Sequence, residues 1–119
     1  MIGYYITPVA APRMTRRDKF SPSKAAQKYF AFRSECRLKR LTIPESGAHI
    51  TFVLPVPKSW SAKKKAAHIN QPHRSTPDAD NLLKAVLDAI YDDDRAVWDI
   101  RVTKRWGTIG QIIVDEYAA

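Results

Sequence analysis

Residues 76–90 read Thr-Pro-Asp-Ala-Asp-Asn-Leu-Leu-Lys-Ala-Val-Leu-Asp-Ala-Ile, and the rest of the chain is organised around this segment. Its large apolar residues recur every three or four positions, which is the spacing of one face of an α-helix. The apolar positions are Leu82, Leu83, Val86, Leu87 and Ile90. Asp80, Lys84 and Asp88 are also four apart, so they define a polar edge beside that face. The spacing therefore predicts a helix that buries one side and leaves its first turn open.

The start of this helix carries two carboxylates. Pro77 biases Thr76 away from helical angles, and either Asp78 or Asp80 suits the N-cap position. In an extended or capping segment, residues two apart can point the same way. Asp78 and Asp80 can therefore share one ligand.

Acidic residues are concentrated around the predicted helix. Seven of the twelve acids lie between Asp78 and Asp99, and the two basic residues there leave a local charge of −5. The rest of the chain carries +13, because the whole sums to +8. Gathered carboxylates repel one another unless a cation lies among them. An acidic pocket in a basic exterior suits a polyanion brought to a metal-loaded centre.

A purely structural interpretation of the same residues is also open. Aspartates at a helix start are usually caps that complement the helix dipole. Lys84, four residues after Asp80, would make an ordinary ion pair within the helix. Residues 92–94, Asp-Asp-Asp, would then be a solvated turn. The occurrence of all three features in a chain otherwise short of acid weakens this interpretation.

The order of the polar residues follows a known motif. The pattern D-x-D-N-x-x-K, then D-A, then D-D-x-x-V is matched by Asp78, Asp80, Asn81, Lys84, Asp88, Ala89, Asp93, Asp94 and Val97. In this pattern the sequence resembles the RusA family of Holliday junction resolvases, which are small, homodimeric, magnesium-dependent endonucleases of bacteria and phages. The match is dense over residues 77–104, and the order of the flanking elements agrees along most of the chain.

The resemblance implies roles for individual residues. Asp78, Asp80 and Asp94 would be the catalytic carboxylates that bind Mg²⁺, with Mn²⁺ as a substitute, and Lys84 would be the catalytic lysine. The chain has three consecutive acids where the family pattern has two. Asp94 is favoured because Val97 follows it at the family spacing, and Asp93 stays open as the alternative.

Composition limits the other classes of function. A chain of 119 residues predicts a single domain over 1–119, and a pI near 9.8 favours an anionic partner, most simply DNA. No apolar run approaches the roughly 20 residues that span a bilayer, so we expect no membrane partner. The single cysteine indicates a cytoplasmic protein, and the resemblance implies a bacterial or phage-infected cell with association to the nucleoid. No glycine-rich phosphate loop is present, so no nucleotide cofactor is expected.

Basic residues gather outside the acidic window. We expect phosphate contacts from a proline-broken loop near the N-terminus, from a lysine triplet and from the residues just before the motif, with solvated surface as the alternative. These residues are Arg13, Arg16, Arg17, Lys19, Lys63, Lys64, Lys65, His73 and Arg74. A zinc site through His68 and His73 is disfavoured, because no cysteine partners accompany them.

The remaining pattern predicts the other elements. We expect a strand over 3–9, a helix that starts at Ser21-Pro22-Ser23 with the proline in its first turn and ends at about 40–43, a strand over 49–54 and a short helix that ends near His68. Alternation over 98–103 and 109–114, with a turn at Gly107, predicts a hairpin. Together these give an α+β fold with a small mixed or antiparallel sheet and helices packed against it. The resemblance implies that this fold is dimeric.

The predicted function is that of a magnesium-dependent, structure-specific endodeoxyribonuclease. It would resolve Holliday junctions by paired symmetric nicks, in DNA recombination and repair, with branched DNA and a second copy of the chain as partners. Two alternatives are a nuclease of broader branched-DNA specificity, acting on flaps and forks, and a junction-binding module that does not cleave.

Overall fold

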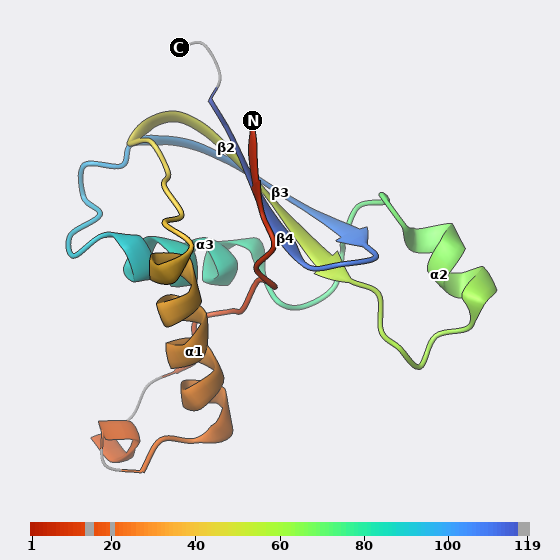
Figure 1. Cartoon of the computed structure of the whole chain (residues 1–119), viewed down its shortest axis with the longest axis horizontal. Coiled ribbons are helices and arrows are strands. Elements are labelled where there is room, and N and C mark those ends of the chain that lie inside the picture. Colours follow the sequence, from red (N-terminus) through yellow and green to blue (C-terminus); the bar gives the residue numbers. More distant parts are fainter. Residues whose placement is uncertain (14–15, 20, 117–119) are drawn as a thin grey trace.

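A computed structural model describes residues 1–13, 16–19 and 21–116, without the side chains of Asp18 and Lys19. In chain order the elements are β1 (Ile2–Tyr4), the 3₁₀ helix η1 (Arg16–Lys19), α1 (Lys24–Leu38), β2 (Ser46–Pro55), α2 (Ala62–His68), α3 (Ala79–Ile90), β3 (Asp99–Gly107) and β4 (Gln111–Glu116). Helices α1 and α3 pack against each other beside the sheet, whereas α2 stands away from them (Figure 1). The predicted α+β class is confirmed.

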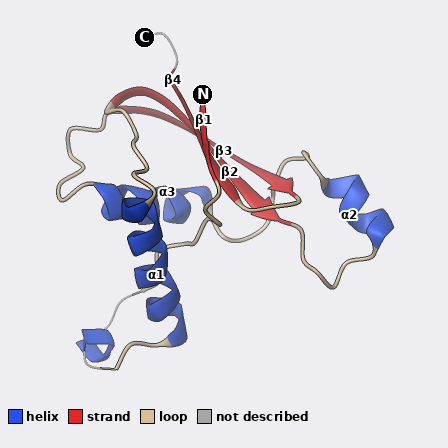
Figure 2. Ribbon diagram, in the orientation of Figure 1, coloured by secondary structure: helices blue, strands red, loops and turns tan. Residues whose placement is uncertain are grey.

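The sheet has four strands in the order β1-β4-β2-β3 (Figure 2). β2 pairs in parallel with β3 and antiparallel with β4, so the sheet is mixed. The predicted hairpin is therefore wrong, because β2 lies between the two strands that were expected to pair. Residues 108–110 pass over the end of β2 instead. Four Cα steps reach about 13 Å, which exceeds the roughly 9.6 Å across two strand spacings.

The crossing over β2 brings backbones close together. A Cβ placed on Gly110 would lie 2.7 Å from the Cα of Thr7, and one on Gly107 would overlap Cγ1 of Val53. Both glycines are buried. The missing side chains therefore let a three-residue connection run tightly against its neighbours.

The core lies between the sheet and the two packed helices. Ile50, Phe52 and Ile112 from the strands meet Leu82 and Val86 from α3, and all five are fully buried. The buried residues of α3 follow the spacing predicted for its apolar face. This burial fixes the orientation of α3 and leaves the polar edge of its first turn outside.

Helix α1 begins slightly later than predicted, since Pro22 lies before the N-cap Ser23 and not in the first turn, and it ends earlier than predicted. The hydroxyl of Ser23 accepts a hydrogen bond from the Ala26 amide at 3.1 Å, which caps the helix. Arg40 then adopts φ 55°, and the Leu41 amide donates to the Cys36 carbonyl at 3.0 Å. This left-handed closure of the last turn ends the helix at Leu38, before the expected 40–43.

Among the described residues, no helix combines the length and the apolar character that crossing a membrane requires.

The crossing predicts a sharp difference between two glycines. We expect Gly110→Ala to lower the free energy of unfolding by about 1–3 kcal/mol, because backbone atoms of Thr7 cannot move aside as a flexible side chain could. Gly3→Ala is the matched control, since a Cβ there meets nothing within 4 Å. Urea denaturation of both variants checks this. Equal stabilities would contradict the close approach.

Candidate active site

The first turn of α3 leaves its carboxylates without an internal partner. Asp78 is the N-cap residue, and its backbone carbonyl accepts from the Leu82 amide at 3.1 Å. Its side chain makes no capping hydrogen bond. Both Asp78 and Asp80 are exposed. The structural interpretation of these aspartates as caps therefore does not describe what Asp78 does.

The predicted structural ion pair in this turn is also not formed. Among the described residues, neither Asp80 nor Lys84 takes part in an ion pair. Lys84 is exposed one helical turn after Asp80. Two carboxylates and an ammonium thus lie at one open edge of α3, available to a ligand.

The loop that leads into α3 is held by Lys104 of β3. The Nζ of Lys104 donates to the Ser75 carbonyl at 2.7 Å and to the Pro77 carbonyl at 2.8 Å. The carbonyl of Lys104 in turn accepts from the His73 amide at 3.1 Å. Lys104 therefore positions the backbone immediately before Asp78, a role that sequence reasoning missed. The sequence signal for this role was the position of Lys104, which follows Ile100 and Val102 at two-residue steps and so lies on the same face of the strand as these core-facing residues.

His73 has a different environment from the one expected. Its side chain is only 5% exposed and its ring centroid lies 4.1 Å from that of Trp106. Burial, with a further contribution from the Lys104 charge, lowers the pKa of His73, so the imidazole is neutral at physiological pH. The expected phosphate contact by His73 does not fit this position, because a buried neutral ring offers phosphate neither charge nor access.

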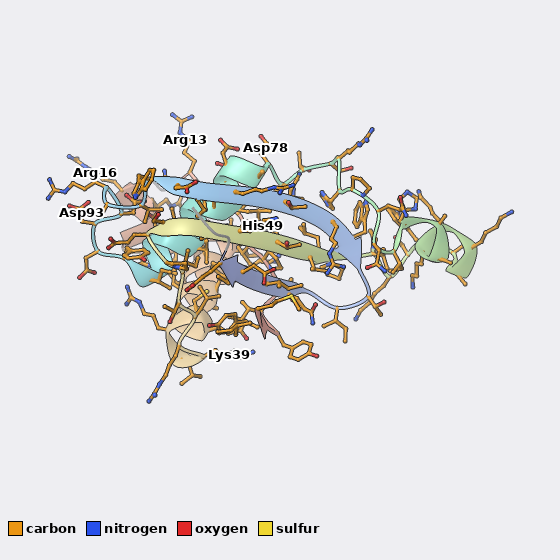
Figure 3. All side chains as sticks on the ribbon, turned by 90° about the horizontal axis from the view of Figure 1, so that it is seen from above. Arg13, Arg16, Lys39, His49, Asp78 and Asp93 are labelled. Atoms are coloured by element: carbon orange, nitrogen blue, oxygen red, sulfur yellow. The ribbon has the colours of Figure 1, made fainter. Side chains whose placement is uncertain are left out.

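The third predicted carboxylate lies at the other end of the helix. α3 has 12 residues, so its ends are about 18 Å apart, and Asp94 follows its C-terminal end. Figure 3 shows Asp78 and the neighbouring Asp93 well separated along the sheet. In residues 1–13, 16–19 and 21–116, no three His, Cys, Asp or Glu side chains are grouped to hold a metal. The chain alone thus brings together Asp78, Asp80 and Lys84, without Asp94.

The turn after α3 distinguishes Asp93 from Asp94. One carboxylate oxygen of Asp93 lies 2.7 Å from Nε of Arg95, and the other accepts from the Arg95 amide at 3.1 Å. The Asp94 carboxylate has no such partner within the described residues. Asp93 therefore orders the turn, and Asp94 presents an exposed carboxylate.

The predicted phosphate-binding residues form separate groups. Near the N-terminus, Arg13, Arg16 and Arg17 are exposed. Arg74, in the loop before the first turn of α3, is also exposed. The side chain of Lys19 lies outside the described residues. The lysine triplet is on α2, which buries none of its residues. There Lys63 and Lys64 are exposed and Lys65 is half-buried, and the Nζ of Lys64 lies 4.3 Å from the Trp60 ring centroid.

Comparison with known proteins identifies one family. The family model described as "Endodeoxyribonuclease RusA" matches residues 5–115. Searches of curated proteins and of solved structures returned no significant match. The matched range includes every carboxylate and lysine of the candidate site.

The Lys104 contacts make a testable prediction about the loop. In Lys104→Met, two carbonyls lose a charge-assisted hydrogen bond, so we expect a stability loss of about 1–3 kcal/mol. We also expect faster amide hydrogen exchange in residues 70–80 and a rise in the pKa of His73, since a neighbouring positive charge is removed. Hydrogen-exchange mass spectrometry and NMR titration measure both. Lys63→Met on α2 is the control, and loop exchange unchanged from wild type would show that Lys104 does not hold the loop.

Proposed function

The chain belongs to the RusA family of endodeoxyribonucleases, and from this premise we propose that it resolves Holliday junctions by paired, symmetric, magnesium-dependent nicks. The role would lie in DNA recombination and repair. The substrate would be branched DNA, and the active form would be a homodimer folded from one domain per chain.

The observation that carries the proposal is the state of the first turn of α3. Asp78, Asp80 and Lys84 are exposed and have no partner among the described residues. Carboxylate oxygens are the ligands that Mg²⁺ prefers, so Asp78 and Asp80 fit this ion, and Mn²⁺ as a substitute. When bound, the metal supplies stabilisation of phosphate charge and a water of lowered pKa.

The chain's own residues supply the remaining chemistry. Lys84 donates hydrogen bonds to the phosphate oxygens, where negative charge develops during attack. The backbone amides at the start of α3 are not capped by the Asp78 side chain, and the helix dipole there favours a phosphate. Lys104 keeps the loop before Asp78 in place, so these groups are oriented before the substrate binds.

The third ligand leads to the proposed dimer. Because α3, about 18 Å long, lies between Asp78 and Asp94, and no three carboxylates of the described residues are grouped, a complete site would need the carboxylate of a second chain. A two-fold dimer with antiparallel α3 helices would place the partner's Asp94 beside Asp78 and Asp80, twice by symmetry. Trp98, 74% exposed and four residues after Asp94, offers this end of the molecule an aromatic surface for such packing.

The basic residues outside the candidate site would contact the backbone of the junction arms. They are Arg13, Arg16, Arg17, Lys19, Lys63, Lys64, Lys65 and Arg74. Contacts of this kind select a shape and position the DNA, and they carry little sequence information. We therefore expect structure-selective binding whose affinity falls steeply with salt.

One assay separates the proposed function from its alternatives. Labelled four-way junction, flap and plain duplex are each incubated with the protein, with Mg²⁺ or with EDTA. We expect paired symmetric nicks in the junction with Mg²⁺ only. Equal cutting of all three substrates would replace the resolvase with a broader nuclease, and binding without any cut would indicate a non-cleaving module.

The carboxylates of the first turn can be tested singly. We expect Asp80→Asn to reduce cleavage by ~100-fold or more, because a metal ligand contributes several kcal/mol to the transition state, while junction binding is kept. Asp92→Asn, another exposed aspartate near α3, should cleave normally. Loss of binding by Asp80→Asn in a gel-shift assay would assign Asp80 a structural role instead.

The shared site predicts complementation between two inactive proteins. In a mixed dimer of Asp80→Asn and Asp94→Asn chains, one site carries both substitutions and the other carries neither. We therefore expect the mixture to recover nicking of one strand, without paired resolution, although each protein alone is inactive. A mixture as inactive as its components would show that the three carboxylates do not come from two chains.

A further inference from the structure

A cavity of about 500 Å³ adjoins the candidate active site. Four parts of the chain form its wall: residues 7–12, the start of α1, the end of β2, and residues 73–77, with Trp106 of β3 between them. Thr76 and Pro77 belong to this wall and directly precede Asp78. On the opposite side, the Ala11 amide donates to the Asn81 carbonyl at 3.2 Å, which fastens the N-terminal wall to the first turn of α3.

The lining of the cavity is apolar and aromatic. Five of the lining residues are prolines: Pro8, Pro12, Pro55, Pro57 and Pro77. Trp106 is backed by a second ring, with its centroid 5.0 Å from that of Trp60. Lys28 is the one charged side chain among the described residues of the wall. Such a lining does not suit a phosphate, which needs several donors, and it suits a flat, largely apolar group such as a nucleobase packed against prolines and the edge of Trp106.

The wall also contains a polar group that lacks a partner. His73 is only 5% exposed. Its Nδ1 makes no hydrogen bond within the described residues. A buried nitrogen without a partner is uncommon in proteins, and a ligand or an ordered water usually completes it. The neutral imidazole has one donor and one acceptor nitrogen, which matches the mixed donor and acceptor edge of a nucleobase.

We propose that this cavity receives one nucleobase of the bound strand, unstacked at the branch point, beside the phosphate held at Asp78 and Asp80. The inference rests on the proposed function for the DNA strand that delivers the base. A base at a branch is already poorly stacked, so its extrusion costs less than extrusion from a duplex. The cavity thereby gives the protein a contact with a base next to the cut, in addition to its contacts with the backbone.

The test fills the cavity from an exposed position. Ala25 is exposed in the first turn of α1 and lines the cavity, so Ala25→Phe can occupy it without entering the core. Ala31→Phe, on the exposed surface of the same helix and outside this cavity, is the matched control. Ala25→Leu is a second filling variant. Thermal denaturation confirms that each variant is folded.

Binding is measured in EDTA, so cleavage does not enter. The substrate is an immobile four-way junction, intact or with a single abasic site at each of the two nucleotides on either side of the branch. We expect Ala25→Phe and one of the abasic sites each to weaken binding about tenfold, as loss of one stacked base does. Combined, they should cost no more than either alone, because both remove the same contact.

Independent effects at every scanned nucleotide, or wild-type affinity of Ala25→Phe, would overturn the proposal. The two proposals can fail separately. If the wild-type protein nicks the junction but the effects of Ala25→Phe and the abasic site simply add, the base-binding proposal is rejected and the proposed resolvase function stands. Failure to bind any junction removes both.

Discussion

The Lys104 ammonium, bonded to the carbonyls of Ser75 and Pro77, is the contact on which the candidate site depends. It joins the loop before α3 to the central part of β3, a strand whose register with β2 is fixed over nine residue pairs. The loop is also paired with β3 through its backbone, from Asn70 to His73. A rigid sheet thereby sets the position at which α3 begins.

This attachment explains why Asp78 need not serve its own helix. A cap residue usually stabilises a helix start through its side chain, at about 1 kcal/mol. Here the start of α3 is fixed by Lys104 on one side and by burial of Leu82 and Val86 on the other. The Asp78 carboxylate is consequently exposed and makes no capping hydrogen bond, which leaves it available to a ligand.

The sequence predicts local structure well and predicts partners poorly. The spacing of Leu82, Val86 and Leu87 was sufficient to place α3, and the segment Ser21-Pro22-Ser23 was sufficient to place the start of α1 to within a few residues, since both depend on neighbours in the chain. The pairing of β3 with β2 was missed, because alternation describes the faces of a strand and not which strand lies beside it. Lys104 was one of 20 basic residues until its carbonyl partners were known. The sequence predicts a surface position for His73, because its contact with the Trp106 ring joins positions distant in sequence.

The separation of Asp94 from Asp78 and Asp80 has a use in the proposed dimer, where it sets the distance between the two sites. α3 buries residues along its length and is about 18 Å long, so it is a spacer between Asp78 at its start and Asp94 beyond its end. In the proposed two-fold dimer the same spacer acts twice, in opposite directions. It therefore sets the distance between the two complete sites at about one helix length. Two sites held at one fixed distance by the core can cut two strands of one branch point symmetrically, whereas sites complete within each chain would leave that distance to the interface alone. In the proposed dimer, the length of α3 would thus link the packing of the core to the pairing of the cuts.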